Sequence, residues 1–324
     1  MRASIRTLCL LCLFFPTIAG AQADNWPSRA IKLIVAFPPG AGADLTGRSI
    51  GQKLSESFGV PVVVDNRVGA NGSIGADAVA KAVADGYSML LADRGAFGIN
   101  PSLYKRLPYD PLKDFEYVGI ATVGHYVLAL HQGVPAKSYS EFISYAKSRP
   151  GLVNYASFGI GSMAQLNIEA LNQRAGIKLN HIPYKGGGPA VAALVAGDVA
   201  TTIVTAPSLL GHIKDGRVRA IAIGSPKRSS LLQDVPTMAE LGAGEDTLIP
   251  TYFGFALPAG TSKSIVQRLS MEIRKALVNK ELVEKFANVG LEPGNASPEE
   301  MLATVRADIP RFGRLVASIG IQPE

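Results

Sequence analysis

The chain has 324 residues, which exceeds one average domain and fits two, and that length buries a sizeable core without disulfides. Hydrophobic residues make up 47% and charged residues 18%, a balance that excludes an intrinsically disordered chain. The formal net charge is +6 without a run of lysines and arginines, so no nucleic-acid partner is expected, whereas a modest positive field suits anionic solutes.

The first 23 residues have the pattern of a secretory signal peptide. Arg2 and Arg6 form a positive n-region, an apolar stretch follows at 7–18, and residues 21–23 (AQA) match a cleavage site. The alternative is a retained membrane anchor, which the shortness of the apolar stretch disfavours because about 20 residues are needed to span a bilayer. We therefore expect residues 1–23 to be removed on export, with cleavage near Ala23.

Strand and helix signals then alternate along the chain. The nearly continuous apolar run at 31–37 indicates a strand that is buried on both faces in a parallel sheet. Ile50, Leu54 and Phe58 recur at four-residue spacing, as on one face of a helix. Further strands are expected at 61–65, 88–92, 126–131, 153–157, 180–183, 201–204 and 218–223. Repeated strand–helix–strand units predict doubly wound α/β sheets.

Two α/β domains are expected from this order of elements. The alternation restarts after residues 126–131, and from residue 263 onward the pattern is mostly helical. We expect this helical segment to pack back on the first domain, which would comprise residues 24–124 and 250–324. The second domain would comprise residues 125–249.

A proline- and glycine-rich loop, residues 38–44 (PPGAGAD), joins the first strand to the first helix. Open α/β sheets bind ligands at the carboxyl ends of their strands, and the free N–H groups of a helix start favour anions. Glycines allow a carboxylate to approach the backbone closely, and Asp44 is suited to cap the helix or hold a bridging water. A plain helix-entry turn explains the same residues equally well.

Two later loops also lead into helices. Residues 157–162 (SFGIGS) offer amides and hydroxyls to a second anionic group, and Phe158 either covers an apolar ligand body or packs in the core. In residues 184–189 (YKGGGP), Lys185 either pairs with an anion or is solvated. Asp93 and Arg94 follow an apolar strand, and Arg94 either makes a bidentate bond to a carboxylate or pairs with Asp93.

No catalytic, metal or cofactor site is expected. Residues 42–49 resemble a phosphate-binding loop, but Arg48 replaces its lysine and Asp44 would face the phosphates. Both cysteines lie in the segment to be removed, and the four histidines lack metal-ligand spacing. A hydrolase or lyase on the same kind of fold would need a nucleophile–base pair or a metal, and the sequence shows neither.

Several stretches, taken in order, resemble the tripartite tricarboxylate transporter receptor family, also called Bug proteins. The matching stretches are 26–27, 31–44, 62–76, 85–87, 99–104, 107–115, 181–189, 212–216 and 234–237. The resemblance implies an α/β, type II-like, two-domain periplasmic binding protein with a hinged ligand cleft. It also implies a small organic carboxylate as ligand and membrane permease subunits as partners, without a cofactor; we expect a monomer. A ligand-sensing receptor subunit for a signalling system, using the same clamp, is the alternative.

The resemblance also implies the binding residues. Those of the first loop match the family pattern well, and Ser157, Gly161 and Ser162 match in the second domain. The full expected ligand-binding set is Phe37, Pro38, Gly40, Ala41, Gly42, Asp44, Arg94, Gly95, Ala96, Phe97, Ser157, Phe158, Gly161, Ser162, Tyr184, Val204 and Thr205.

Departures from the family pattern concern the ligand body. The family often has small or hydroxyl residues in place of Asp93 and Arg94, histidine in place of Phe97, and alanine near Phe158. Many members carry an aspartate where Val204 aligns, so a counter-charge for a ligand ammonium is missing there. Phe158 offers a ring face, and Arg94 offers a fork to a second carboxylate. We therefore expect an aromatic or dicarboxylic ligand without an α-ammonium.

Overall fold

The computed structural model describes residues 26–40, 42–244 and 247–323. The expected signal peptide and the site residue Ala41 therefore lie outside the described residues. In the described part of the chain, no helix is both long and apolar enough to cross a membrane.

The first of two sheets in the described residues has the strand order β11-β4-β10-β3-β1-β2. Its strands are β1 (Ile31–Val35), β2 (Val62–Asn66), β3 (Ser88–Asp93), β4 (Phe115–Gly124), β10 (Thr251–Pro258) and β11 (Leu291–Pro293). β1 pairs in parallel with β2 and β3, whereas β10 runs antiparallel to both β3 and β4.

Helices cover both faces of this sheet. Leu33 and Val35 point into a core shared with α1 (Gly42–Phe58), α8 (Lys263–Leu277) and α9 (Lys280–Ala287). Ile34 and Ala36 point into the opposite core, shared with α2 (Ser73–Ala80) and α10 (Pro298–Ser318). The apolar run is nearly continuous because helices cover both faces of β1 and only Lys32 is exposed. We call this sheet with its helices the first lobe.

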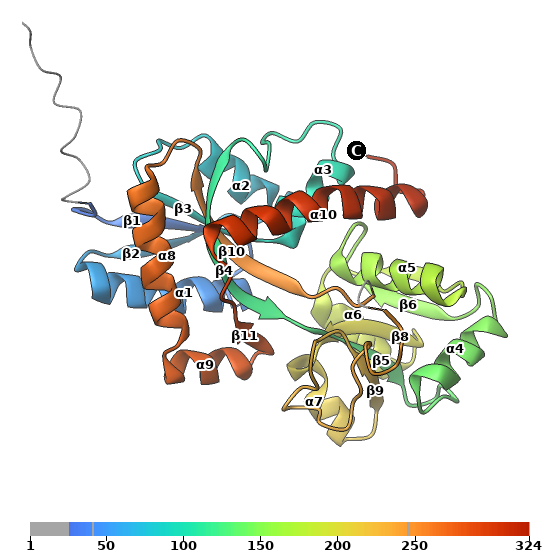
Figure 1. Cartoon of the computed structure of the whole chain (residues 1–324). Coiled ribbons are helices and arrows are strands. Elements are labelled where there is room, and N and C mark those ends of the chain that lie inside the picture. Colours follow the sequence, from blue (N-terminus) through green and yellow to red (C-terminus); the bar gives the residue numbers. More distant parts are fainter. Residues whose placement is uncertain (1–25, 41, 245–246, 324) are drawn as a thin grey trace, which may run out of the picture.

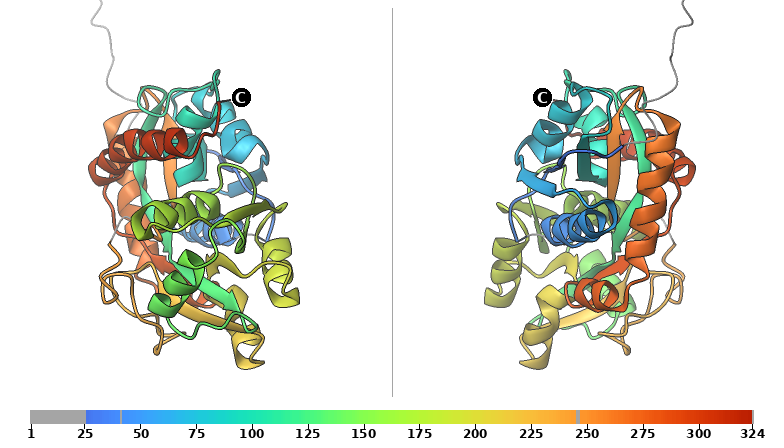
Figure 2. Two further views of the ribbon diagram at one scale, coloured as in Figure 1. Left: turned by 90° about the vertical axis from the view of Figure 1, so that its right-hand side faces the viewer. Right: turned by 90° about the vertical axis from the view of Figure 1, so that its left-hand side faces the viewer.

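The second sheet has the strand order β7-β6-β8-β5-β9. Its strands are β5 (Tyr126–His131), β6 (Asn154–Ser157), β7 (Asn180–Pro183), β8 (Thr201–Thr205) and β9 (Val218–Ile223). Its helices are α4 (Tyr139–Lys147), α5 (Met163–Ala175), α6 (Gly187–Ala196) and α7 (Pro207–Lys214). We call this sheet with its helices the second lobe. Coloured green to yellow, it lies beside the first lobe in Figure 1 and extends below it in the side views of Figure 2.

Both sheets are mixed, which the strand–helix alternation did not predict. The reason is that the chain crosses between the lobes twice (Figure 1). It leaves the first lobe where β4 ends at Gly124 and β5 begins at Tyr126, and it returns on β10. Since the returning strand lies beside the departing one, β10 pairs antiparallel with β4. The prediction of an α/β fold with two domains is confirmed.

Helix α10 packs against both lobes. Met301 and Val305, near its start, belong to a core of the first lobe. Phe312 and Val316, further along, belong to the main core of the second lobe. The same core takes in Ile99 and Leu103 from two short helical segments after β3, η2 (Gly95–Ile99) and α3 (Asn100–Leu103). The C-terminal helix therefore contributes to the core of each lobe.

Candidate functional site

A cavity of about 790 Å³ lies where elements of the two lobes meet. Its wall takes residues from the β1–α1 loop, from the end of β3 and from the helix starts of the second lobe. The residues of the described chain that line it are Phe37, Pro38, Gly40, Gly42, Asn71, Asp93, Gly95, Ile99, Tyr126, Phe158, Ser162, Met163, Gly186, Gly187, Val204, Thr205, Pro207, Ser208, Thr251, Phe253, Asn288, Val289 and Leu291.

Within the described chain, four α-helices begin at this wall: α1, α5, α6 and α7. The first N–H groups of a helix have no partner within the helix and carry partial positive charge. Neither Gly186 before α6 nor Ala206 before α7 caps its helix with a side chain. None of the described lining residues is a lysine or an arginine. Backbone amides therefore supply the positive potential that suits an anionic ligand.

A larger groove of about 1050 Å³ lies between α4, α5 and α10. Lys147, Arg174, Arg311 and Arg314 line it, but only α4 has its first turn on this groove. The smaller cavity is the candidate site because ligands of open α/β sheets bind beyond the carboxyl ends of the strands, where the helices begin.

Asp44 fixes the conformation of the first loop from outside the cavity. Its carboxylate is buried and accepts hydrogen bonds from Gly40 N at 3.0 Å, Arg48 Nε at 2.9 Å and Asn66 Nδ2 at 2.9 Å. Burial acts to raise the pKa of Asp44, but the hydrogen bonds from Arg48, Gly40 and Asn66 outweigh it, and the pKa falls below 3.8. Asp44 does not line the cavity, so its carboxylate positions Gly40, which does.

Replacing Asp44 with alanine is expected to weaken ligand binding by about 1 kcal/mol or more, the scale of one lost polar contact that orders a binding loop. Titration calorimetry with a carboxylate that the protein binds measures this loss of affinity. Asp65→Ala is the control, because Asp65 pairs with Lys32 and Arg67 and does not line the cavity. Equal affinity of the Asp44→Ala variant and the unmodified protein would contradict a positioning role.

The cavity brings together nine residues of the set expected from the sequence. They are Phe37, Pro38, Gly40, Gly42, Gly95, Phe158, Ser162, Val204 and Thr205. Six further members of that set, besides Asp44, are described but do not line the cavity: Arg94, Ala96, Phe97, Ser157, Gly161 and Tyr184.

Arg94 points away from the cavity into the protein. Its Nη1 donates to Asp308 Oδ1 at 2.5 Å, and its guanidinium lies 4.8 Å from the centre of the Tyr252 ring. Both side chains of the ion pair are about nine-tenths buried or more, with exposures of 10% and 4%. Arg94 therefore has neither of the two partners expected from the sequence, a ligand carboxylate or Asp93, because its guanidinium pairs with Asp308 on α10.

Ala96 and Phe97 belong to the core of the first lobe. Both are fully buried, and the Phe97 ring meets Phe115 and Tyr117 edge-on with centroids 5.9 and 5.2 Å apart. The carbonyl of Ala96 accepts a 2.6 Å hydrogen bond from Tyr109. These contacts face away from the cavity, so Phe97 contributes to packing and not to the ligand wall.

Ser157 and His181 form a pair that the sequence did not reveal. Ser157 Oγ lies 2.6 Å from His181 Nε2, and burial lowers the pKa of His181. However, Ser157 is fully buried and is not a lining residue, and its hydroxyl also bonds to the backbone of Gly159. A nucleophile must reach its substrate, so this pair fits a structural role that holds the second loop.

Several lining residues were not expected from the sequence. Asn288 and Val289, between α9 and β11, and Leu291, the first residue of β11, reach the cavity from a part of the chain where local sequence signals indicate no site. Asn71 lies in a stretch that carries the family resemblance, which was the one available signal. In the sequence, Asp93 stands out only as the neighbour of Arg94. Among the described residues, no group of three or more His, Cys, Asp or Glu side chains is placed to hold a metal.

Comparisons with known proteins identify the family and the fold. Residues 46–321 match the family described as "Tripartite tricarboxylate transporter family receptor". BugT of Bordetella pertussis is 40% identical over 97% of this chain and 98% of its own. Rpa4515 of R. palustris, solved with adipate, is 33% identical with a TM-score of 0.80, covering 92% of this chain and 100% of that one. MatC of Rhodopseudomonas palustris, solved with bound malate, is 28% identical with a TM-score of 0.75, covering 90% and 100%.

The family match spans far more than half of the chain, and the match to BugT spans nearly all of both proteins. The fold of these neighbours is that of a periplasmic binding protein, as in the solved structure of BugD at a TM-score of 0.76. The resemblance seen in the sequence motifs is confirmed, and the chain belongs to the tripartite tricarboxylate transporter receptor family.

Proposed function

We propose that this protein is a periplasmic solute-binding protein that captures a small organic carboxylate and delivers it to a tripartite tricarboxylate-type membrane permease. One observation carries the proposal: four helix N-termini of the described chain meet at one cavity whose described lining has no lysine or arginine. Rpa4515 and MatC, solved with adipate and malate, support a carboxylate as the ligand of this chain. We propose no catalytic role and no cofactor.

The ligand body is proposed to be largely apolar. Phe37, Tyr126, Phe158 and Phe253 line the cavity, and the rings of Phe37 and Phe253 meet edge-on with centroids 5.6 Å apart. Such a wall suits an aromatic ring or an aliphatic chain. Of the two ligand types expected from the sequence, the aromatic carboxylate gains support from these rings. Arg94 no longer supports a dicarboxylate, because it pairs with Asp308. The relatives solved with adipate and malate still support one.

A matched panel of small molecules tests this function. Aromatic and aliphatic carboxylates are expected to raise the melting temperature of the protein, whereas the corresponding neutral amides are not, because the helix starts stabilise negative charge. A ligand at 100 times its Kd should add about 2.7 kcal/mol to the free energy of unfolding. The ligand should be recovered unchanged. Stabilisation by amides as strong as that by carboxylates, or conversion of the ligand, would rule the function out.

We propose that the cleft closes on its ligand, with the two crossings between the lobes as the hinge. A ligand held from both lobes favours the closed arrangement. Small-angle X-ray scattering should therefore show a smaller radius of gyration when the carboxylate found in the panel saturates the protein. Superimposable curves with and without that ligand would argue against closure.

A further inference from the structure

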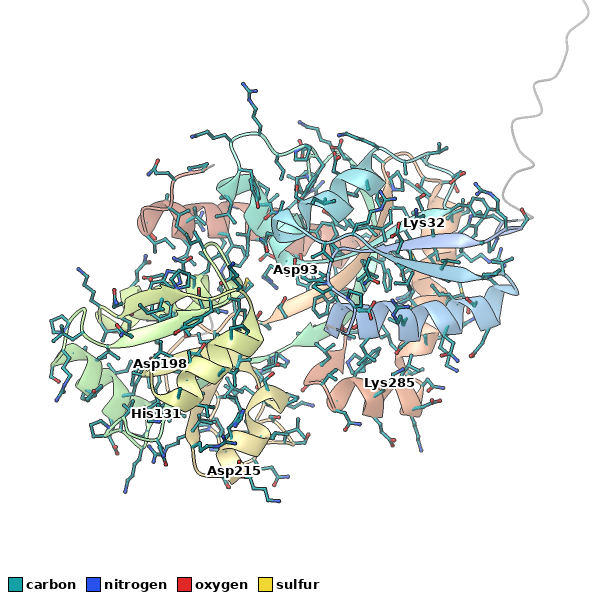
Figure 3. All side chains as sticks on the ribbon, turned by 180° about the vertical axis from the view of Figure 1, so that it is seen from behind. Lys32, Asp93, His131, Asp198, Asp215 and Lys285 are labelled. Carbon is teal, nitrogen blue, oxygen red and sulfur yellow. The ribbon has the colours of Figure 1, made fainter. Side chains whose placement is uncertain are left out.

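Asp93 is the one acidic side chain among the described residues that line the cavity. It stands at the carboxyl end of β3, and Figure 3 shows it between the two lobes. The lining residues of the described chain include no lysine, arginine or histidine to balance it. A site whose helix starts attract an anion therefore also contains a fixed negative charge.

The immediate surroundings of Asp93 leave that charge without a side-chain partner. Its Oδ1 accepts a hydrogen bond from Ala96 N at 3.1 Å. In the part of the chain that the structure describes, no side chain donates to its carboxylate. The neighbouring Arg94 bonds to Asp308 at 2.5 Å, so its charge is already balanced by another carboxylate.

Burial has the expected effect on this carboxyl group. It raises the pKa of Asp93 to about 6, against the lowering effects of the amides of Ala96 and Gly95 and of the Arg94 charge. Three tyrosines, Tyr109, Tyr126 and Tyr252, also face this region, and burial raises the pKa of each, so they stay neutral. At neutral pH the carboxyl group of Asp93 is ionised, although burial disfavours its charge. A ligand cation in hydrogen-bond contact would offset this desolvation cost.

We propose that the ligand is zwitterionic, with a carboxylate at the helix starts and an ammonium that pairs with Asp93. This inference rests on the proposed function and deepens it. It revises the expectation of a ligand without an α-ammonium, which relied on Val204 standing where many relatives carry an aspartate. Val204 lines the cavity as an apolar residue, but an acid from the first lobe supplies the counter-charge instead.

Two pairs of acids that differ only in the amine test the proposal. They are 6-aminohexanoate with hexanoate, and phenylalanine with 3-phenylpropanoate. Titration calorimetry at pH 7.5 should show, in at least one pair, that the amino acid binds about tenfold or more tightly than its amine-free partner. The Asp93→Asn variant should lose this preference, which is the ratio of the affinity for the amino acid to the affinity for its amine-free partner. Its amide oxygen still accepts from Ala96 N, so the local fold is retained.

Glu292→Gln is the matched control. Glu292 is an exposed acid next to the lining residue Leu291, so it tests for a general effect of charge near the cavity. The ratio should stay within about twofold of that of the unmodified protein. As the pH falls from 7.5 to 5.5, the ratio should also fall in the unmodified protein and stay constant in Asp93→Asn, because protonation removes the Asp93 charge. Asp308 and Arg94, the other charged groups nearby, are present in both proteins.

The possible failures are distinguishable. If amine-free acids bind as tightly as the amino acids in both pairs, or if Asp93→Asn leaves the ratio unchanged, Asp93 is only a helix cap and the inference is overturned. The carboxylate-binding function then stands. If no acid binds, with or without an amine, the proposed function falls and this inference falls with it.

Discussion

Replacing Arg94 with alanine is expected to destabilise the protein by about 3–5 kcal/mol, because it leaves the buried carboxylate of Asp308 without its counter-charge. The pair is well buried, Arg94 bonds to Asp308 Oδ1, and Asp308 Oδ2 has no hydrogen-bond partner among the described residues. Urea denaturation at pH 7.5 measures the loss. Arg217→Ala is the control: the Arg217–Asp215 pair has exposures of 45% and 55%, and losing it should cost about 1 kcal/mol or less.

The pH dependence of this loss follows from Asp308. Burial raises its pKa from 3.8 to about 6, while Arg94 acts to lower it. A carboxyl group with a raised pKa in the folded state contributes stability below its unfolded pKa and loses that contribution as the pH rises through 6. Without Arg94 the folded pKa rises further, so the destabilisation should be largest above pH 7 and smaller at pH 5.

A double variant separates the charge from the packing. Combining Arg94→Met with Asp308→Leu removes both charges and should recover most of the stability, since hydrophobic replacements of buried ion pairs are often neutral or better. A single Arg94→Ala variant that loses less than about 1 kcal/mol would show that the pair does not act as a buried ion pair.

Replacing Phe312 with alanine is expected to cost about 3–5 kcal/mol and to weaken the coupling between the lobes. Phe312 is fully buried in the core of the second lobe, although the helix that carries it begins on the first sheet. Removing the ring leaves a void where α10 joins that core. Differential scanning calorimetry should then resolve two transitions where the unmodified protein shows one.

Phe286→Ala is the matched control for Phe312. Phe286 is equally buried, but it lies on α9 within the core of the first lobe. We expect a similar loss of stability without a second transition. Indistinguishable calorimetric profiles for the two variants would mean that α10 does not couple the lobes.

Local patterns in the sequence determined much of the fold and part of the candidate site. The apolar run of β1, the four-residue repeat of Ile50 and Leu54, and the glycine-rich loops predicted strands, helices and helix starts. These signals are local because backbone preference and burial pattern depend on neighbours within a few residues. The ordered motifs predicted the family, and the first loop and the start of α5 do line the cavity.

Which charged side chains line the cavity depends on tertiary packing. Arg94 and Asp93 are adjacent in the sequence, yet Arg94 turns inward to Asp308, 214 positions away, and Asp93 remains on the cavity wall. In the same way, Phe97 joins a core with Phe115 and Tyr117. Adjacent side chains leave the backbone in different directions, and their partners come from elements that are distant in the chain. The packing of the lobes therefore determines which side chains contact each other. A sequence pattern shows that the charged and aromatic residues are present, but it does not show their partners.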